Sequence, residues 1–257
     1  MLRVVNALQE PAAAPNDSSS PDVAAGAPPN LVSGRPYLRV KVVMEWCLAA
    51  ALLAVTAPLI VVFGMLVKLT SRGPAFYFQT RLGRNGSPYR ICKLRTMVHN
   101  CEESTGPVWA AKDDVRITPL GRVLRDTHMD ELPQLWNVLR GQMGLIGPRP
   151  ERPEIVSRIE RHIPDYRCRL QVRPGVTGLA QMRLPADTDL ESVRLKLAHD
   201  LYYIRNVNFV MDLRIAACTV FYFLGAAADA LCNSAVGSYG REVKGRLDTA
   251  ESTVEAA

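Results

Sequence analysis

Hydrophobic residues form one long run near the start of the chain and are interleaved with polar residues elsewhere. Residues 46–67 are apolar apart from Thr56, Pro58 and Gly64. As a helix, these roughly 22 residues would extend about 33 Å, which is enough to cross a bilayer. The pattern predicts a membrane helix over residues 37–70. Pro58 should break it, because proline lacks a backbone N–H and clashes with the carbonyl of Ala54.

Positive charge lies on both sides of this apolar run. A spanning helix normally keeps its excess of lysine and arginine on the cytoplasmic side. Charge on both flanks favours a re-entrant helix that bends at Pro58 and returns to the face it left. An ordinary span with a tolerated proline also fits the residues. The flanking cations are Arg35, Arg39 and Lys41 before the run, and Lys68, Arg72, Arg81 and Arg84 after it.

The rest of the chain has the pattern of a small cytosolic domain over residues 71–232. Two strand-like stretches, 75–79 and 89–94, flank Asn85-Gly86, a strong hairpin signal. Helical spacing predicts four short or medium helices. The expected fold is therefore α+β and mainly helical, with a re-entrant membrane helix and a short β-hairpin. The predicted helices cover residues 117–124, 132–139, 153–162 and 190–204.

The two ends of the chain differ from this middle part. Residues 207–231 are apolar but carry Asp212, Arg214 and Asp229, a pattern typical of an amphipathic helix at the membrane surface. A buried core helix is the alternative. Residues 1–36 are rich in Ala, Pro, Ser and Asn and predict a disordered leader, and residues 233–257 predict a loose tail.

Composition narrows the classes of function. The net charge of +6 favours anionic partners, but the lysines and arginines are spread along the chain, which argues against nucleic acid. The six cysteines form no C-x-x-C pair, and the four histidines do not cluster. A structural zinc site and a disulfide framework are therefore excluded, and the pattern favours reduced thiols in the cytosol.

Adjacent carboxylates at Asp130 and Glu131 are the sharpest candidate for chemistry. Pro133 is tolerated only in the first turn of a helix, so a helix should start near Asp130. Both carboxylates would then lie at the positive end of the helix dipole, beside free N–H groups where a phosphate binds readily. The alternative is simple helix capping without chemistry.

Several cations accompany this pair. Lys93 and Arg95 lie two residues apart on one face of a predicted strand, where they would either bind substrate or only protect a hairpin edge. Arg149 is held between Pro148 and Pro150, in a rigid turn suited to gripping a phosphate, although a solvated surface turn has the same pattern. Arg125 lies on the helix before the carboxylates, where a solvated face is the usual interpretation.

Taken together, these motifs resemble a known family. Residues 41–226 resemble the monotopic phosphoglycosyl transferases, the bacterial sugar transferases that start exopolysaccharide, capsule and O-antigen synthesis. The resemblance favours the re-entrant form of the membrane helix. Besides the proline-broken apolar run, it rests on residues 79–83 (QTRLG), 93–97 (KLRTM), 130–134 (DELPQ), 147–150 (GPRP), 174–181 (PGVTGLAQ) and 200–204 (DLYYI).

The resemblance implies a two-step transfer of a sugar-1-phosphate from a nucleotide (UDP-type) sugar to polyprenyl (undecaprenyl) phosphate. Asp130 would form a covalent phosphosugar intermediate, and Glu131, with Asp130, would bind Mg²⁺. Arg149 would grip the nucleotide phosphates, helped by Lys93, Arg95 and Pro148, and Arg125 would meet the lipid phosphate. The enzyme would work on the cytoplasmic face of a bacterial inner membrane, in contact with membrane lipid.

Some positions depart from the family pattern. His128 stands where serine is usual, Glu45 where aspartate is usual and Gly144 where serine is common, which leaves the sugar open. Two other functions remain as alternatives: a non-catalytic membrane scaffold of a polysaccharide-assembly complex, and a membrane-tethered metal-dependent phosphodiesterase. A homo-oligomer is compatible with the sequence, which does not fix the oligomeric state.

Overall fold

The computed structural model describes residues 31–32, 36–101, 114–185, 189–223, 237, 239–240 and 242–243. The predicted leader and tail lie almost entirely outside these residues, as do residues 224–231. The described elements follow in the order α2 (Tyr37–Thr70), β1 (Phe76–Leu82), η1 (Arg84–Gly86), β2 (Pro88–Leu94), α3 (Pro119–Asp126), η2 (Met129–Glu131), α4 (Gln134–Leu139), β3 (Gly144–Ile146), α5 (Pro153–Glu160), η3 (Pro164–Gln171), β4 (Gly175–Thr177), α6 (Leu179–Arg183), α7 (Leu190–Asn206) and α8 (Phe209–Phe223). The α+β, mainly helical fold class is confirmed.

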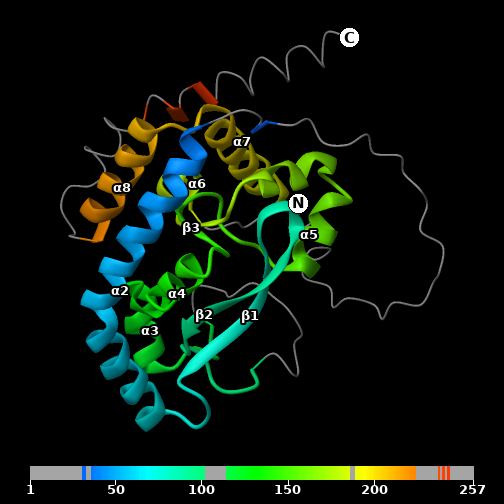
Figure 1. The fold of residues 1–257 in the computed structure, drawn as a ribbon. Coiled ribbons are helices and arrows are strands. Elements are labelled where there is room, and N and C mark those ends of the chain that lie inside the picture. Colours follow the sequence, from blue (N-terminus) through cyan, green and yellow to red (C-terminus); the bar gives the residue numbers. More distant parts are fainter. Residues whose placement is uncertain are drawn as a thin grey trace.

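The apolar run lies in α2, one helix of 34 residues. Within the described ranges it is the single helix long and apolar enough to cross a membrane. Pro58 lies inside it, and α2 changes direction about half-way along its course (Figure 1). Proline removes one backbone hydrogen bond and crowds the preceding turn, so it bends the helix without ending it.

The α2 helix contacts the folded domain near its start, in its first half and near its end. Near its start, Lys41 Nζ donates to Asp212 Oδ2 of α8 at 2.7 Å. Ala49, fully buried, packs in a cluster with residues of α4. Near its end, Val67 packs with Leu94 and Leu124. Both ends of the helix therefore contact the same body, whereas a straight span would hold them on opposite sides of a bilayer.

The predicted hairpin is confirmed. Strands β1 and β2 pair antiparallel from Phe76 opposite Leu94 to Leu82 opposite Pro88. Asn85 and Gly86 in the connecting η1 turn have φ of 55° and 75°. Asparagine and glycine tolerate this left-handed conformation better than other residues, so the local sequence sets the reversal.

A second, smaller strand pair was not predicted. Strands β3 and β4 pair parallel, with Gly144 opposite Gly175 and Ile146 opposite Thr177. The backbones approach so closely that a Cβ on Gly175 would lie 2.1 Å from the backbone nitrogen of Gly147. Glycine is required there by space, and the contact fixes the turn at residues 147–150 against the loop at 174–178.

The remaining helices build two apolar cores around these strands. One core joins α5, η3 and α7 and includes the buried residues Val156 and Val193. The other joins α7 and α8. Capping fixes where two of the helices start: Thr118 Oγ1 accepts from Gly121 N at 2.9 Å before α3, and Asp189 forms a capping box with Ser192 before α7.

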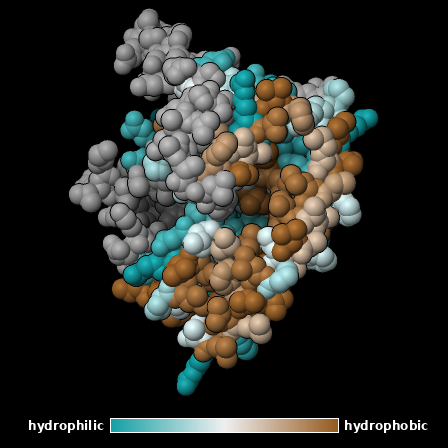
Figure 2. All heavy atoms as spheres, turned by 90° about the vertical axis from the view of Figure 1, so that its left-hand side faces the viewer, coloured by the Kyte–Doolittle hydropathy of each residue, from teal (hydrophilic) through white to brown (hydrophobic). Residues whose placement is uncertain are grey.

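One side of the molecule is covered by hydrophobic side chains. Figure 1 shows α2 and α8 along this side, and Figure 2 shows apolar residues over much of the same face. Helix α8 combines both predicted alternatives. Met211 and Ile215 are fully buried in the core, while Phe209 and Leu213 are about half exposed. The exposed apolar surface over α2 and α8 is much larger than scattered surface residues produce, which indicates contact with a membrane.

Candidate active site

The predicted carboxylates and cations meet in one cavity of about 610 Å³. Its walls come from β1, β2, the segment after β2, α3, η2, the turn at residues 147–150 and the start of α5. Eight lysines and arginines line it against three carboxylates, so the cavity favours an anionic ligand. The cations are Arg81, Lys93, Arg95, Arg116, Arg125, Arg149, Arg152 and Lys196, and the carboxylates are Asp130, Glu131 and Glu151.

Asp130 and Glu131 lie in the 3₁₀ turn η2, not at the start of a regular helix. The prediction of a helix start near Asp130 is wrong, because α4 begins at Gln134. His128 takes a positive φ of 55°, and the chain turns tightly after it. The backbone N–H of Glu131 already donates to the carbonyl of His128 at 3.1 Å. Side-chain cations, rather than free helix N–H groups, therefore surround the two carboxylates.

Asp130 is buried, and its carboxylate is not paired with a donor from the described residues. Its side chain lines the cavity and the residue is 7% exposed. Within the described part of the chain, no group donates a hydrogen bond to its carboxylate. Burial raises the pKa of Asp130 above its usual range, and the charge of Lys93 opposes this rise. A carboxylate stripped of water and without donors keeps its lone pairs free, which suits a nucleophile.

Glu131, by contrast, is held by two cations. Lys93 Nζ donates to its Oε1 at 2.6 Å, and Arg149 Nη2 donates to the same oxygen at 3.2 Å. Burial alone would raise the pKa of Glu131, but Lys93 and Arg149 outweigh burial and hold this pKa far below its usual range. Glu131 is therefore ionised at any physiological pH. Its neighbour is the better candidate for covalent chemistry.

Arg149 is positioned by the glycine-proline turn, as predicted from its sequence. Its Nη1 donates to Gln181 Oε1 at 3.0 Å, while its Nη2 contacts Glu131. Pro148 is buried and does not line the cavity; its carbonyl accepts from Gly175 N at 2.9 Å. Pro148 thus supports Arg149 instead of contacting a ligand. The partner Gln181 was not predicted, although its motif was part of the resemblance.

Arg95 and Arg125 also reach the cavity, from two sides of Thr96. Arg125 Nε donates to Thr96 Oγ1 at 2.8 Å. Arg95 Nη2 donates to the carbonyl and hydroxyl of Ser71, at the end of α2. The Nε and Nη1 atoms of Arg95 are buried and have no partner within the described residues. Buried donors of this kind suit the oxygens of a phosphate.

Asn137 was not predicted to contribute, yet it fixes the strand that carries Lys93. Its Oδ1 accepts from Cys92 N at 3.0 Å, and its Nδ2 donates to the carbonyl of Arg90 and to Gln142 Oε1, each at 2.8 Å. These bonds join α4 to β2 and hold Lys93 against Glu131. The position of Asn137, a polar residue on the apolar face of a short helix, was the sequence signal that could have indicated this role.

The donor set bears on the type of metal that the site could hold. The described residues contain no group of three or more histidine, cysteine or acidic side chains. Two neighbouring carboxylates remain, Asp130 and Glu131. Mg²⁺ commonly binds in this way, through one or two carboxylates together with substrate phosphates and water. Cys101, His99 and His128 also line the cavity, but among the described residues they do not come together as the ligand cluster that a zinc site requires.

Comparison with known proteins identifies the family. A sequence model of the bacterial sugar transferases matches residues 36–226, which include α2, the cavity and α8. This chain belongs to the bacterial sugar transferase family. The resemblance read from its motifs is confirmed, and with it the prediction that the chain is an enzyme of this kind.

Two curated relatives are similar over most of this chain. The UDP-glucose:undecaprenyl-phosphate glucose-1-phosphate transferase of Caulobacter vibrioides is 44% identical, over 73% of this chain and 72% of its own length. The exopolysaccharide production protein PSS of Rhizobium leguminosarum bv. phaseoli is 42% identical, over 65% of this chain and 86% of its own.

A relative that is named for a different sugar is also similar to this chain. The UDP-N-acetylgalactosamine-undecaprenyl-phosphate N-acetylgalactosaminephosphotransferase of Aeromonas hydrophila is 39% identical, over 72% of this chain. The matched region spans 43% of that relative, so the chain corresponds to less than half of it. Family membership therefore does not identify the sugar.

Proposed function

We propose that this bacterial sugar transferase moves a sugar-1-phosphate from a UDP-sugar to undecaprenyl phosphate, through a covalent intermediate on Asp130. The observation that carries the proposal is the contrast between the two neighbouring carboxylates. Asp130 is buried and accepts no hydrogen bond from the described residues, whereas Glu131 is fixed by Lys93 and Arg149. The activities for which the relatives are named supply the substrate classes.

The reaction proceeds in two displacements at phosphorus. A carboxylate oxygen of Asp130 attacks the phosphorus bonded to the sugar, the bond to the uridine monophosphate oxygen breaks, and that nucleotide leaves. An oxygen of undecaprenyl phosphate then attacks the same phosphorus. The bond to Asp130 breaks, which frees its carboxylate and yields the diphosphate-linked sugar. Splitting one transfer into two makes each step easier.

The cations of the cavity bind and orient the anionic groups. Arg149 and Lys93 already neutralise Glu131 and lie where a diphosphate would be gripped. Arg125 and the unpaired nitrogens of Arg95 are the further donors for phosphate oxygens. Such fixed charges stabilise the charge that develops on a transferring phosphoryl group.

Mg²⁺ is part of the proposal. Glu131 is compensated by Lys93 and Arg149, whereas Asp130 forms no ion pair among the described residues, and its charge repels an incoming phosphate unless a cation lies between them. Glu131 and Asp130 would hold the ion, which would neutralise phosphate charge and polarise the phosphoryl oxygen. Glu131 Oε2 has no partner among the described residues, and that oxygen is open to such a ligand.

We also propose that α2 is a re-entrant helix in the cytoplasmic leaflet of the inner membrane. Because Lys41 near one end and Val67 near the other both contact the same domain, the active site stays on one side of the bilayer. The exposed apolar face brings this site to headgroup level, where a lipid phosphate lies. Single cysteines at the two flanks, Val40→Cys and Leu69→Cys, each in a background with all six native cysteines replaced by serine, should both react with a reagent added from the cytoplasmic side. Labelling from opposite sides would refute the re-entrant form.

The activity test uses purified protein in detergent with Mg²⁺ and a panel of UDP-sugars. Wild type should release uridine monophosphate even without undecaprenyl phosphate, in an amount equal to the enzyme, and gain the mass of one sugar phosphate. Asp130→Asn should do neither. Asp126→Asn, an exposed aspartate at the end of α3, is the matched control and should behave as wild type.

The same experiment separates the alternatives. A scaffold would release no nucleotide under any condition. A phosphodiesterase would keep releasing nucleotide without the lipid, because water would be its acceptor. Normal turnover by Asp130→Asn would refute the covalent role of this residue.

A further inference from the structure

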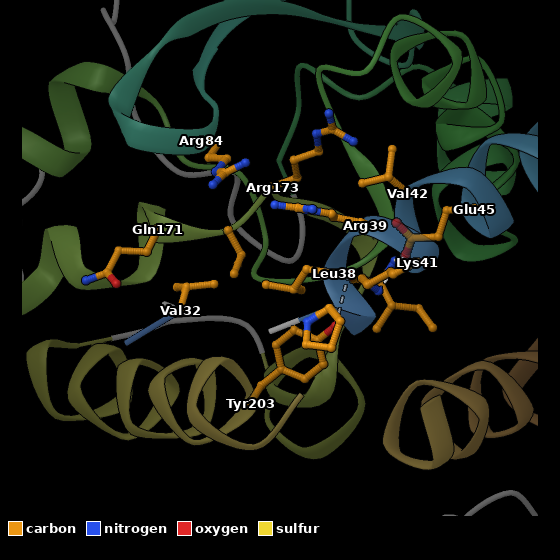
Figure 3. Close-up of a pocket in the computed structure, with 13 residues that line it drawn as sticks. Val32, Leu38, Arg39, Lys41, Val42, Glu45, Arg84, Gln171, Arg173 and Tyr203 are labelled. Atoms are coloured by element: carbon orange, nitrogen blue, oxygen red, sulfur yellow. Dashed lines mark hydrogen bonds and ion pairs between the residues drawn. The ribbon is translucent and has the colours of Figure 1, made fainter. Parts of the chain in front are cut away.

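A second cavity, of about 590 Å³, lies at the start of α2 and shares no lining residue with the active-site cavity. Separate parts of the chain form it: Val32 and Pro36 before α2, the first turns of α2, the hairpin turn η1, Ile146 of β3, the end of η3 with the two residues after it, and Tyr203 of α7 (Figure 3). The proposed reaction gives no role to any of these residues, so the cavity needs its own explanation.

Three arginines supply the charge of this cavity. Arg39, Arg84 and Arg173 gather on the side toward the hairpin, and Tyr203 closes the opposite side (Figure 3). Across the described ranges, no carboxylate forms an ion pair with any of the three. Guanidinium groups stay protonated at all relevant pH values, so three of them around one cavity repel each other until an anion binds.

The lysine and the acid of the same cavity compensate each other. Lys41 Nζ lies 2.7 Å from Glu45 Oε1 and 2.7 Å from Asp212 Oδ2. Glu45 also accepts from the backbone N–H of Ile146 at 2.9 Å. Lys41 is thus shared with a second carboxylate outside the cavity lining, and the three arginines outnumber the one carboxylate charge that this group leaves over.

The other walls of the cavity are apolar. Aliphatic side chains line it beside the arginines, and the ring of Tyr203 adds a further apolar surface. A free inorganic anion would use the arginines but not these walls. A ligand with an anionic head and an apolar remainder uses both. The aliphatic lining residues are Val32, Leu38, Val42, Ile146 and Val172.

The location of the cavity indicates where such a ligand comes from. Arg39 precedes Trp46, the first residue of the apolar run, by seven positions, or about 10 Å along the helix. Val40 and Val43, next to the cavity-lining residues, are 55% and 63% exposed and belong to the apolar face. The cavity therefore opens beside the part of α2 that enters the lipid, at the depth of phospholipid head groups.

We propose that this cavity binds the head group of an acidic phospholipid, with its phosphate on Arg39, Arg84 and Arg173. Arginine pairs with phosphate through two parallel hydrogen bonds and is preferred over lysine for such contacts. The three arginines come from α2, η1 and the segment after η3. A bound head group would therefore join the membrane helix to the catalytic domain at a point distant from the reaction.

The test compares two double variants in nonionic detergent. Arg84→Gln/Arg173→Gln removes two cavity arginines without changing the membrane helix. Arg161→Gln/Arg194→Gln removes two exposed arginines elsewhere and is the matched control. Each protein is titrated with fluorescent phosphatidylglycerol, with fluorescent phosphatidylcholine and with inorganic phosphate, and thermal unfolding without lipid verifies that each variant is folded.

The cavity variant should bind phosphatidylglycerol about tenfold more weakly than wild type, a loss of ~1.4 kcal/mol. The control variant should bind it as wild type does, and phosphatidylcholine should bind weakly to all three proteins. Equal binding of phosphatidylglycerol by both variants would overturn the proposal. Displacement of phosphatidylglycerol by inorganic phosphate at comparable concentration would also overturn it, because the site would then bind free anions. Turnover by the active site is not part of this readout, so failure here leaves the proposed reaction untouched.

Discussion

Replacing Glu131 by glutamine removes the carboxylate that Lys93 and Arg149 share. Lys93 and Glu131 are largely buried, with side chains 18% and 13% exposed. Removing one partner of a buried ion pair costs about 3–5 kcal/mol. Arg149 is 42% exposed, so solvent screens its pair and reduces its contribution to less than ~1 kcal/mol. Glutamine keeps one oxygen as an acceptor, and we therefore expect a loss of about 3 kcal/mol in the free energy of unfolding.

Thermal unfolding in detergent measures this loss. In a chain of this size, ~1 kcal/mol changes the Tm by about 2–4 °C, so Glu131→Gln should unfold about 6–12 °C below wild type. Glu191→Gln removes an exposed carboxylate at the start of α7 and serves as the control. If Glu131→Gln and Glu191→Gln unfolded at the same temperature, the reasoning from the ion pairs would be refuted.

The pH dependence of this difference gives a second check. The pKa of Glu131 is lowered in the folded state, so its ionised form stabilises the fold above the unfolded pKa of about 4.3. This stabilisation is lost as the pH falls from that value through the folded pKa. The Tm gap between wild type and Glu131→Gln should therefore be complete at neutral pH and shrink below about pH 4.

Asp130→Asn should change stability in the opposite direction. Burial raises the pKa of Asp130, so its ionised form destabilises the fold at neutral pH. Asp130→Asn should unfold at or above the temperature of wild type, and any gain should vanish as the pH falls through the raised pKa. A large loss of stability would show that Asp130 is held by bonds that the structure lacks.

Three further substitutions test the elements that support the site. Asn137→Ala removes the hydrogen bonds that join α4 to β2. We expect a loss of ~2–3 kcal/mol in the free energy of unfolding, together with slower nucleotide release. Unchanged turnover would contradict the role of Asn137 in placing Lys93. Gly178→Ala puts a Cβ 2.1 Å from the carbonyl oxygen of Gly147 and should strongly reduce nucleotide release. Gly64→Ala is the control: its Cβ would lie 3.9 Å from the nearest atom, the Cβ of Ala75, and nucleotide release should not change. Lys41→Met leaves the carboxylate of Asp212 buried without its cation, and should lower the Tm by at least ~6 °C in the same unfolding experiment.

Local signals in the sequence predicted much of the fold. Asn85-Gly86 fixed the hairpin, because its left-handed turn is set by these two residues alone. Helical spacing predicted α5 and α7 to within a few residues. The β3–β4 pair was missed, because each strand has three residues and their pairing joins segments about thirty residues apart. Such short parallel pairs leave no periodic pattern to read.

The sequence predicted which residues gather in the active site, but it did not predict their local backbone conformation. Motifs and resemblance selected Asp130, Glu131 and Arg149, and the structure brings them together. The predicted helix start near Asp130 was wrong. The position of Pro133 in a first helical turn gave no indication of the left-handed turn at His128. The support from Asn137 was missed, since its partners Cys92 and Arg90 lie far away in sequence and come close only after folding.

The attachment of both ends of α2 to the domain has a practical consequence. Deleting this helix to obtain a water-soluble fragment would strip Leu94 and Leu124 of their cover and leave Asp212 without its lysine. The remaining domain would expose part of its hydrophobic core and bury a carboxylate without its cation, and we expect it to aggregate. In this enzyme the membrane helix also covers part of the domain core through a few buried residues, so biochemical work must keep the helix and supply a lipid-like environment.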